Sequence, residues 1–273
     1  MAIITFWNDG KVETNQSMTI AAVATAIAIN YDYKILVVNT KHYDTSLEYA
    51  FEPKNNINSM FSKGKTDLAM GISGVAKAIA SHKTSPEIIT NYTRIILRNL
   101  ELLTEKKTDE DEFDRYKGYI KDILKLANKY YDLVLVDLEG NIEEQEVKEF
   151  IEMSEVNVAT LVQNLNVIDD YIKLREKNSI MQDKKWIVSV GKYDAKSKYT
   201  VKNISKYIKW KNVYGIPYNT MFSMDAPEGK VADYIIRFKR IKPTHVNYEF
   251  IKSVDKEAEQ IVSMVKEGQR KIY

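Results

Sequence analysis

Hydrophobic positions along the chain fall into two kinds of segment that alternate. Solid aliphatic runs, with no polar residue at every second position, lie at 3–7, 34–40, 132–140, 156–162, 186–192 and 213–219. Such runs are typical of parallel strands buried on both faces of a sheet. Between them, apolar residues recur every three or four positions, which is the period of a helix with one buried face. This alternation predicts an α/β fold with a three-layer, doubly wound, mainly parallel sheet of about seven or eight strands.

The helical segments differ in how much of their surface is apolar. Residues 18–29, MTIAAVATAIAI, are apolar around the whole circumference and predict a helix covered on all sides. One stripe runs from Phe113 to Tyr131, and another from Phe250 to Val265. Shorter helices are predicted at 167–175, at 200–208 and in EGKVADYI. The terminal stripe has acidic residues among the lysines of its polar face, which favours packing on the protein body over binding to a membrane.

The region 53–108 is harder to interpret. MFSKGKTD and GISGVAKAIASH suggest short helices and turns, and NLELLTE is a candidate for one more strand. We find no internal repeat and no low-complexity linker, and we therefore predict a single domain spanning 1–273.

Composition narrows the function classes. The 273 residues carry a formal charge of +2, from 40 basic and 38 acidic residues, so whole-chain charge does not favour nucleic acid or an anionic membrane as partner. The absence of cysteine excludes disulfides and thiolate chemistry, and the three scattered histidines lack the spacing of zinc ligands. The start of the chain lacks a secretory signal, and its most apolar run, 20–29, is too short to cross a bilayer. We expect a cytoplasmic protein.

The turn after the first strand is the first place to look for a ligand, because open parallel sheets bind ligands where strands end and helices begin. Here the sequence reads KVETNQSM, residues 11–18. A working P-loop uses glycines to bring backbone N–H groups close to phosphates, a lysine to reach the outer phosphates and a hydroxyl to hold magnesium. The stretch retains a lysine and a serine of such a loop and has no glycine.

At this turn the sequence resembles the ParA/MinD family of partitioning and positioning ATPases, whose variant loop reads K-G-G-x-G-K-[ST]-[ST]. ITFWNDGK, KILVVNT, YYDLVLVDLEG, VGKYDAKSKYTVKNI, VYGIPYN and EGKVADYI follow the family's order over most of the chain. In the resemblance, Lys11 matches the family's extra lysine and Ser17 its magnesium-binding hydroxyl. Asn15 stands in place of a loop glycine, and Gln16 in place of the phosphate-bridging lysine.

Further sites of the family are retained or lost. Asp137, at the end of a buried strand, matches the aspartate that positions magnesium, and Pro217 lies in an IPY element that borders the base. Asn39 and Lys41 stand where the family has acids, including the one that orients the attacking water. Gly191 replaces the asparagine that reads adenine.

The resemblance therefore implies a pseudo-ATPase in which hydrolysis is lost or very weak, because phosphoryl transfer depends on positioning and on stabilisation of charge. ATP or ADP with Mg²⁺ would bind weakly, through Lys11, Asn15, Gln16, Ser17, Asp137 and Pro217, with Ser17 and Asp137 as metal ligands and no catalytic residue. One alternative is an active partitioning or cell-division ATPase in which Lys11 supplies the missing charge. Another is an unrelated α/β enzyme, although no nucleophile–base pair or metal cluster supports it.

Each residue also has a structural interpretation. Ser17 would be a good helix N-cap, a role that contributes roughly 0.5–2 kcal/mol. Lys11 could be a solvated loop lysine, and Asp137 could accept hydrogen bonds from backbone N–H groups at the strand end.

Charge is unevenly distributed along the chain. An acidic segment spans 139–155, and basic segments span 192–211 and 237–242. Such runs are usually solvated faces, but complementary patches also set the specificity of docking, so protein partners are expected there and DNA is not favoured.

The family also implies an oligomer and a role. It sandwiches nucleotide between subunits, so we expect a homodimer, and one that persists without ATP. Degenerate loops are a feature of the branch resembling TadZ and CpaE, which position Flp/Tad-type pilus and secretion machinery. The implied function is a positioning or scaffolding factor recruited to the membrane or cell pole by a partner.

Overall fold

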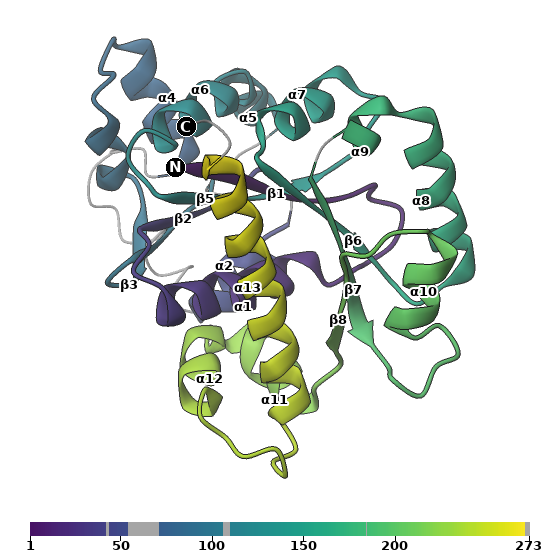
Figure 1. Ribbon diagram of the computed structural model, residues 1–273. Coiled ribbons are helices and arrows are strands. Elements are labelled where there is room, and N and C mark those ends of the chain that lie inside the picture. Colours follow the sequence, from purple (N-terminus) through teal and green to yellow (C-terminus); the bar gives the residue numbers. More distant parts are fainter. Residues whose placement is uncertain (42–43, 54–70, 106–109, 184, 271–273) are drawn as a thin grey trace.

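The computed structural model describes residues 1–41, 44–53, 71–105, 110–183 and 185–270, and these form an eight-stranded sheet with helices on both faces (Figure 1). The strands are β1 (Ala2–Asn8), β2 (Ile35–Asn39), β3 (Arg94–Leu97), β4 (Leu100–Leu103), β5 (Leu133–Glu139), β6 (Val156–Leu161), β7 (Trp186–Tyr193) and β8 (Val213–Pro217). Their order is β3-β4-β2-β5-β1-β6-β7-β8, and every neighbouring pair is parallel except β3–β4. The predicted fold class is therefore confirmed.

Helices cover the sheet in two layers. The α-helices are α1 (Gln16–Asn30), α2 (Ser46–Phe51), α4 (Ile72–Ala80), α5 (Glu110–Lys117), α6 (Ile120–Ala127), α7 (Gln145–Met153), α8 (Leu165–Lys177), α9 (Ser179–Asp183), α10 (Val201–Tyr207), α11 (Thr220–Asp225), α12 (Val231–Phe238) and α13 (Tyr248–Arg270). Two short 3₁₀ helices span Pro86–Asn91 and Ala226–Glu228. One buried cluster joins the sheet to α1, α2 and α11–α13, and the other joins it to α4 and α6–α10.

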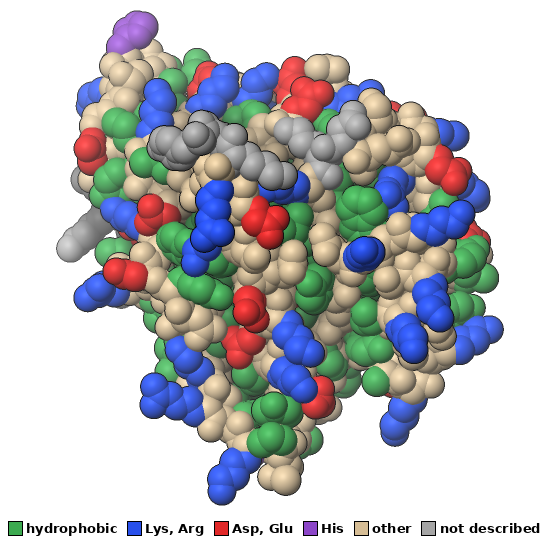
Figure 2. Space-filling view, viewed as in Figure 1, with side chains coloured by type: hydrophobic (Ala, Val, Ile, Leu, Met, Phe, Trp, Pro, Cys, Tyr) green, Lys and Arg blue, Asp and Glu red, His purple; other side chains and the backbone are tan. Residues whose placement is uncertain are grey.

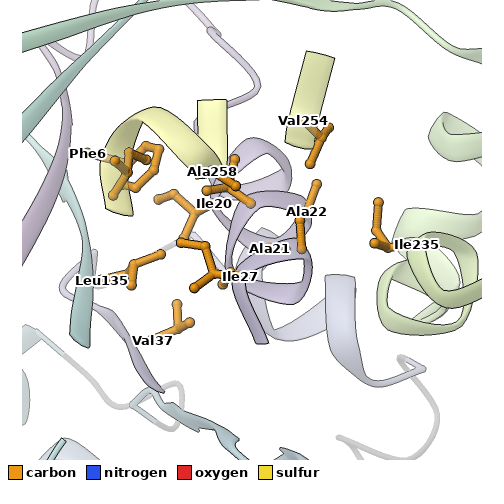
Figure 3. Close-up of a cluster of buried hydrophobic side chains, with 14 of the residues drawn as sticks. Phe6, Ile20, Ala21, Ala22, Ile27, Val37, Leu135, Ile235, Val254 and Ala258 are labelled. Carbon is orange, nitrogen blue, oxygen red and sulfur yellow. The ribbon is translucent and has the colours of Figure 1, made fainter. Parts of the chain in front are cut away.

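Helix α1 is the centre of the first cluster. Its alanines and isoleucines from Ile20 to Ile27 are buried between the sheet, α12 and α13, as the apolar circumference predicts (Figure 3), whereas Ala28 and Ile29 at its end are half-buried. Ala258 and Val254 of α13 lie against it, which confirms that the terminal helix packs on the protein body.

Among the described residues, no helix combines the length and apolar character needed to span a bilayer.

The structure differs from the sequence-based expectations in three places. The stripe from Phe113 to Tyr131 forms two helices, α5 and α6, because Gly118 and the next residue form a turn. Strand β3 was missed, since it is an antiparallel edge strand whose Ile95 is 77% exposed and it lacks the solid buried pattern. NLELLTE does contain a strand, β4, whereas MFSKGKTD lies outside the described residues.

A buried carboxyl lies between the sheet and α13. The Ser189 hydroxyl of β7 donates a hydrogen bond of 2.8 Å to Glu257 Oε2, and Glu257 is 0% exposed. Within the described residues, Oε1 of the same carboxyl has no hydrogen-bond partner. Burial raises the pKa of Glu257 to about 7, and the bond from Ser189 offsets only part of that rise.

We predict that, because of this carboxyl, the free energy of unfolding decreases as the pH rises from about 4.5, the ordinary pKa of glutamate, to about 7. The folded state holds its proton over this range and the unfolded state does not. Glu257→Gln should therefore stabilise the protein more at pH 8 than at pH 5, by on the order of 3 kcal/mol. Urea unfolding at both pH values measures the difference. The matched control is Glu259→Gln at an exposed position of α13; an equal effect of Glu257→Gln at both pH values would contradict the prediction.

Candidate functional site

The turn from β1 to α1 meets the carboxyl ends of β2 and β5, as expected for a ligand site in an open parallel sheet. A cavity of about 180 Å³ opens there. Its walls include the turn itself, the first residues of α1, and Lys41 with Asp44 from the segment after β2. Residues 11–18 thus do connect strand to helix.

Gln16 is buried, and its side-chain amide forms hydrogen bonds within the protein. Its Nε2 lies 2.6 Å from Asp137 Oδ1, 2.9 Å from the Leu138 carbonyl oxygen and 3.1 Å from that of Phe6. Its Oε1 accepts hydrogen bonds from Thr160 Oγ1 at 2.5 Å and Asn8 Nδ2 at 3.0 Å. An amide has two N–H donors and one carbonyl acceptor, so no polar group of Gln16 remains for a ligand.

Asp137 is 0% exposed, and its carboxylate contacts side chains from α1 and from the segment after β2. Besides the amide of Gln16, it accepts a hydrogen bond of 2.6 Å from Ser17 Oγ on Oδ2. Lys41 Nζ lies 3.2 Å from the same oxygen, 2.8 Å from Ser17 Oγ and 2.5 Å from Asp44 Oδ2. The partners of this carboxylate are side chains, which contradicts the view that it satisfies backbone donors at the strand end.

The charges of this cluster reinforce one another. Burial lowers the pKa of Lys41, but the Asp137 and Asp44 carboxylates offset that effect, so the pKa lies above its ordinary value. Burial likewise raises the pKa of Asp44, yet the charge and hydrogen bond of Lys41 bring it below the ordinary value. Lys41 is therefore a charged ammonium, although its side chain is only 9% exposed.

Asn39 orients the segment that carries Lys41. Its Nδ2 donates to the Asp44 carbonyl oxygen at 2.7 Å, and its Oδ1 accepts from the Lys41 backbone N–H at 3.0 Å. Both contacts join Lys41 and Asp44 to the end of β2, so the Asn39 amide helps to hold the lysine in position.

Backbone N–H groups of the β1–α1 turn bond to the turn's own side chains. Asn8 Oδ1 accepts from the Gly10 N–H at 2.7 Å, Asp9 Oδ1 from the Lys11 N–H at 3.1 Å, and Glu13 Oε1 from the Asn15 N–H at 2.5 Å. In a P-loop such donors face phosphate oxygens. Here carboxylates take that role, so an anionic ligand would meet two negative side chains.

Asn15, and not Ser17, is the N-cap residue of α1. Asn15 has φ 64° and is the N-cap residue of α1, and asparagine tolerates this left-handed conformation better than most residues other than glycine. Ser17 lies inside the helix, so the N-cap interpretation of Ser17 is wrong.

Two other residues predicted for the site do not join the buried cluster. The Lys11 side chain is 65% exposed and pairs with Asp9 at 3.1 Å, which agrees with a solvated loop lysine. Pro217 ends β8, three strands from β1 in the sheet, and does not line the 180 Å³ cavity.

The sequence analysis did not identify Asn8, Thr160 and Asp44 as members of the buried cluster. The one available signal was Lys41, a lysine at a position where the family resemblance leads one to expect an acid.

Gly191 has a steric reason to be glycine. It lies in β7, and a Cβ built there would be 2.1 Å from the Thr14 carbonyl oxygen of the turn. The turn is thus packed directly on β7 at this position. Any residue with a Cβ at position 191 would clash with the β1–α1 turn as it is observed.

Magnesium does not fit the site in this arrangement. Mg²⁺ requires near-octahedral oxygen ligands at about 2.0–2.1 Å. The oxygens of Ser17 and Asp137 that would supply it are hydrogen-bonded to each other, and both contact the Lys41 ammonium. No group of three or more potential metal-ligating side chains occurs in the described part of the chain.

A larger cavity of about 550 Å³ adjoins the first and shares Lys41, Asp44 and Glu139 with it. Apolar side chains of α5–α7, among them Phe113 and Phe150, form part of its wall. Lys117 of α5 and Glu146 of α7 form an ion pair of 2.9 Å beside it.

The close contact at β7 yields a prediction. Gly191→Ala should displace the β1–α1 turn and destabilise the protein by about 1–3 kcal/mol, since a methyl group would overlap a backbone oxygen. Gly118→Ala, in the exposed turn between α5 and α6 where nothing lies within 4 Å, is the matched control. Thermal unfolding of both variants measures the effect. Equal melting temperatures for the two variants would show that the turn does not constrain this position.

Comparisons with known proteins identify the fold. No protein-family profile and no curated protein matches the sequence. Three solved structures are similar: the ParA family ATPase of Chlorobium tepidum TLS (TM-score 0.71, 15% identity, 94% of this chain and 98% of that one), the septum site-determining protein MinD of Pyrococcus horikoshii OT3 complexed with Mg-ADP (0.70, 14%, 98% and 99%), and apo McdA of Cyanthece (0.62, 11%, 96% and 99%). At these identities the likeness establishes the architecture alone. The chain therefore has the P-loop NTPase fold of ParA/MinD ATPases.

Proposed function

We propose that this protein is a ParA/MinD-like positioning or scaffolding factor, a pseudo-ATPase that hydrolyses ATP very weakly or not at all. The observation that carries the proposal is the state of Gln16. Where the family resemblance places a phosphate-bridging lysine, this amide is buried and bonded on both its donor and acceptor sides to the protein.

Charge supports the same conclusion. Preorganised positive groups stabilise the transition state of phosphoryl transfer, and loss of one such contact typically lowers turnover by about a hundredfold to a thousandfold. Gln16 removes one cation, and the Glu13 carboxylate accepts from a turn N–H group. Lys41 in place of the water-orienting acid has no free acceptor for a proton from water.

Binding of ATP or ADP is expected to be weak for the same reasons. The structurally similar MinD from Pyrococcus horikoshii was solved with Mg-ADP, so a protein of this fold can hold nucleotide. In this chain the corresponding turn offers carboxylates of Asp9 and Glu13 and an exposed Lys11.

Charged faces are the proposed sites for protein partners. All seven lysines between 192 and 211 are exposed, and Figure 2 shows Lys and Arg side chains gathered over the region of α10. The acidic segment 139–155 is partly neutralised within the protein, because Glu146 pairs with Lys117 and Glu149 with Lys121. The basic segment 192–211 is therefore the stronger candidate for docking an acidic partner. The narrower assignment to Flp/Tad-type pilus machinery stays a prediction.

The proposal predicts no phosphate release above the blank in a steady-state assay with Mg-ATP. Asp137→Ala and Lys11→Ala serve as controls, because each would lower a genuine activity of this site but leave a contaminating one unchanged. Turnover that disappears in both variants would overturn the proposal and favour an active ATPase.

We expect any homodimer to form without nucleotide. The backbone N–H groups of the turn and the Gln16 amide, which would otherwise contact a triphosphate, are hydrogen-bonded to other groups of the protein. Light scattering without nucleotide, with ADP and with Mg-ATP should give the same mass. Assembly that occurs only with Mg-ATP would contradict this expectation.

A further inference from the structure

The ammonium of Lys41 has the surroundings of a bound cation. Its Nζ contacts three oxygens from three parts of the fold: Asp137 Oδ2 of β5, Ser17 Oγ of α1 and Asp44 Oδ2 of the segment before α2. The lysine has three N–H donors, and these three oxygens satisfy all of them. A lysine side chain that is 9% exposed and fully bonded is fixed in position.

Two of these oxygens are the ones expected to bind Mg²⁺. We propose that the Lys41 ammonium is a tethered cation that replaces the divalent metal and makes this site independent of metal. The inference rests on the proposed function, since it concerns the same degenerate site, and it goes further by naming the group that excludes the metal.

Electrostatics accounts for the exclusion. Asp137 and Asp44 bring two negative charges to the cluster, and Lys41 compensates one of them from within. A divalent ion on the same oxygens would lie next to the ammonium, and two cations at such a distance repel each other strongly in a buried site. Without the ammonium, the hydroxyl of Ser17 and the two carboxylates would form an oxygen-rich, anionic set of the kind that hard cations prefer.

Lys41 therefore acts as a positioning residue that ties together three elements. The carboxyl end of β5, the first turn of α1 and Asp44 before α2 all meet at its Nζ. In a metal-dependent site an added ion would perform this cross-linking. Here the covalent chain supplies it, so the arrangement persists at any concentration of Mg²⁺ and nucleotide.

Metal binding without nucleotide tests the inference. The probe is Mn²⁺, followed by electron paramagnetic resonance and by calorimetry, with Mg²⁺ as competitor. We expect no binding by the wild type at millimolar Mn²⁺ and no change in its melting temperature between EDTA and Mg²⁺. Lys41→Ala should bind one Mn²⁺ with an affinity at least about tenfold higher than that of the wild type, and Mn²⁺ should raise its melting temperature.

Controls separate this effect from general loss of charge. Lys11→Ala removes an exposed lysine of the nearby β1–α1 turn and should behave like the wild type. Lys41→Arg keeps the positive charge and should bind no Mn²⁺, whereas Lys41→Ala with Asp137→Asn should lose the metal gained by the single variant. If Lys41→Ala fails to fold, Lys41→Met retains the apolar stem and gives the same comparison.

Two results would overturn the inference: Mn²⁺ bound by the wild type at this site, or no gain of Mn²⁺ affinity in a folded Lys41→Ala or Lys41→Met variant. Neither outcome depends on ATP. A protein that hydrolyses ATP would refute the proposed function, whereas one that binds Mn²⁺ but releases no phosphate would refute only the tethered cation.

Discussion

The neutralisation of Asp137 is the interaction on which the β1–α1 region depends. A carboxylate with no exposed surface is costly to bury unless it is both paired and hydrogen-bonded. Gln16 and Ser17 of α1 and Lys41 of the segment after β2 provide those contacts, so the position of each segment depends on the other. The geometry of the turn, the first residues of α1 and the segment after β2 follows from this one requirement. This end of the sheet is organised around the protein's own charges.

Most of the fold was predictable because it depends on simple, repeated signals. Buried parallel strands such as β5 and β6 read as solid aliphatic runs, and α1 reads as an all-apolar helix, since each is covered on all sides. Strand β3 gave no such signal, because it lies at an edge, half exposed, and its pairing with β4 is antiparallel. Gly118 interrupts a continuous helical stripe, and periodicity alone could not decide between a bend and a break.

The site was predictable only in part. The position of the turn and the approach of Ser17 to Asp137 follow from the order of strands in a parallel sheet and from the family resemblance. The role of Lys41 does not, because it depends on a side chain folding back from the segment after β2 onto β5. Thr160 likewise reaches Gln16 from a strand 144 positions away in the chain. Contacts of this kind, between side chains far apart in the sequence, are visible only in the structure.

The contact between Gly191 and Thr14 limits which sequences this fold tolerates. A Cβ at position 191 would lie 2.1 Å from the Thr14 carbonyl oxygen, so this position of β7 accommodates only a hydrogen atom. Substitution of Gly191 therefore requires a compensating shift of the β1–α1 turn, and Gln16 is constrained in a similar way because its amide is bonded on both its donor and acceptor sides. The turn thus couples a residue of β7 to a residue of α1, although 175 positions separate them in the chain.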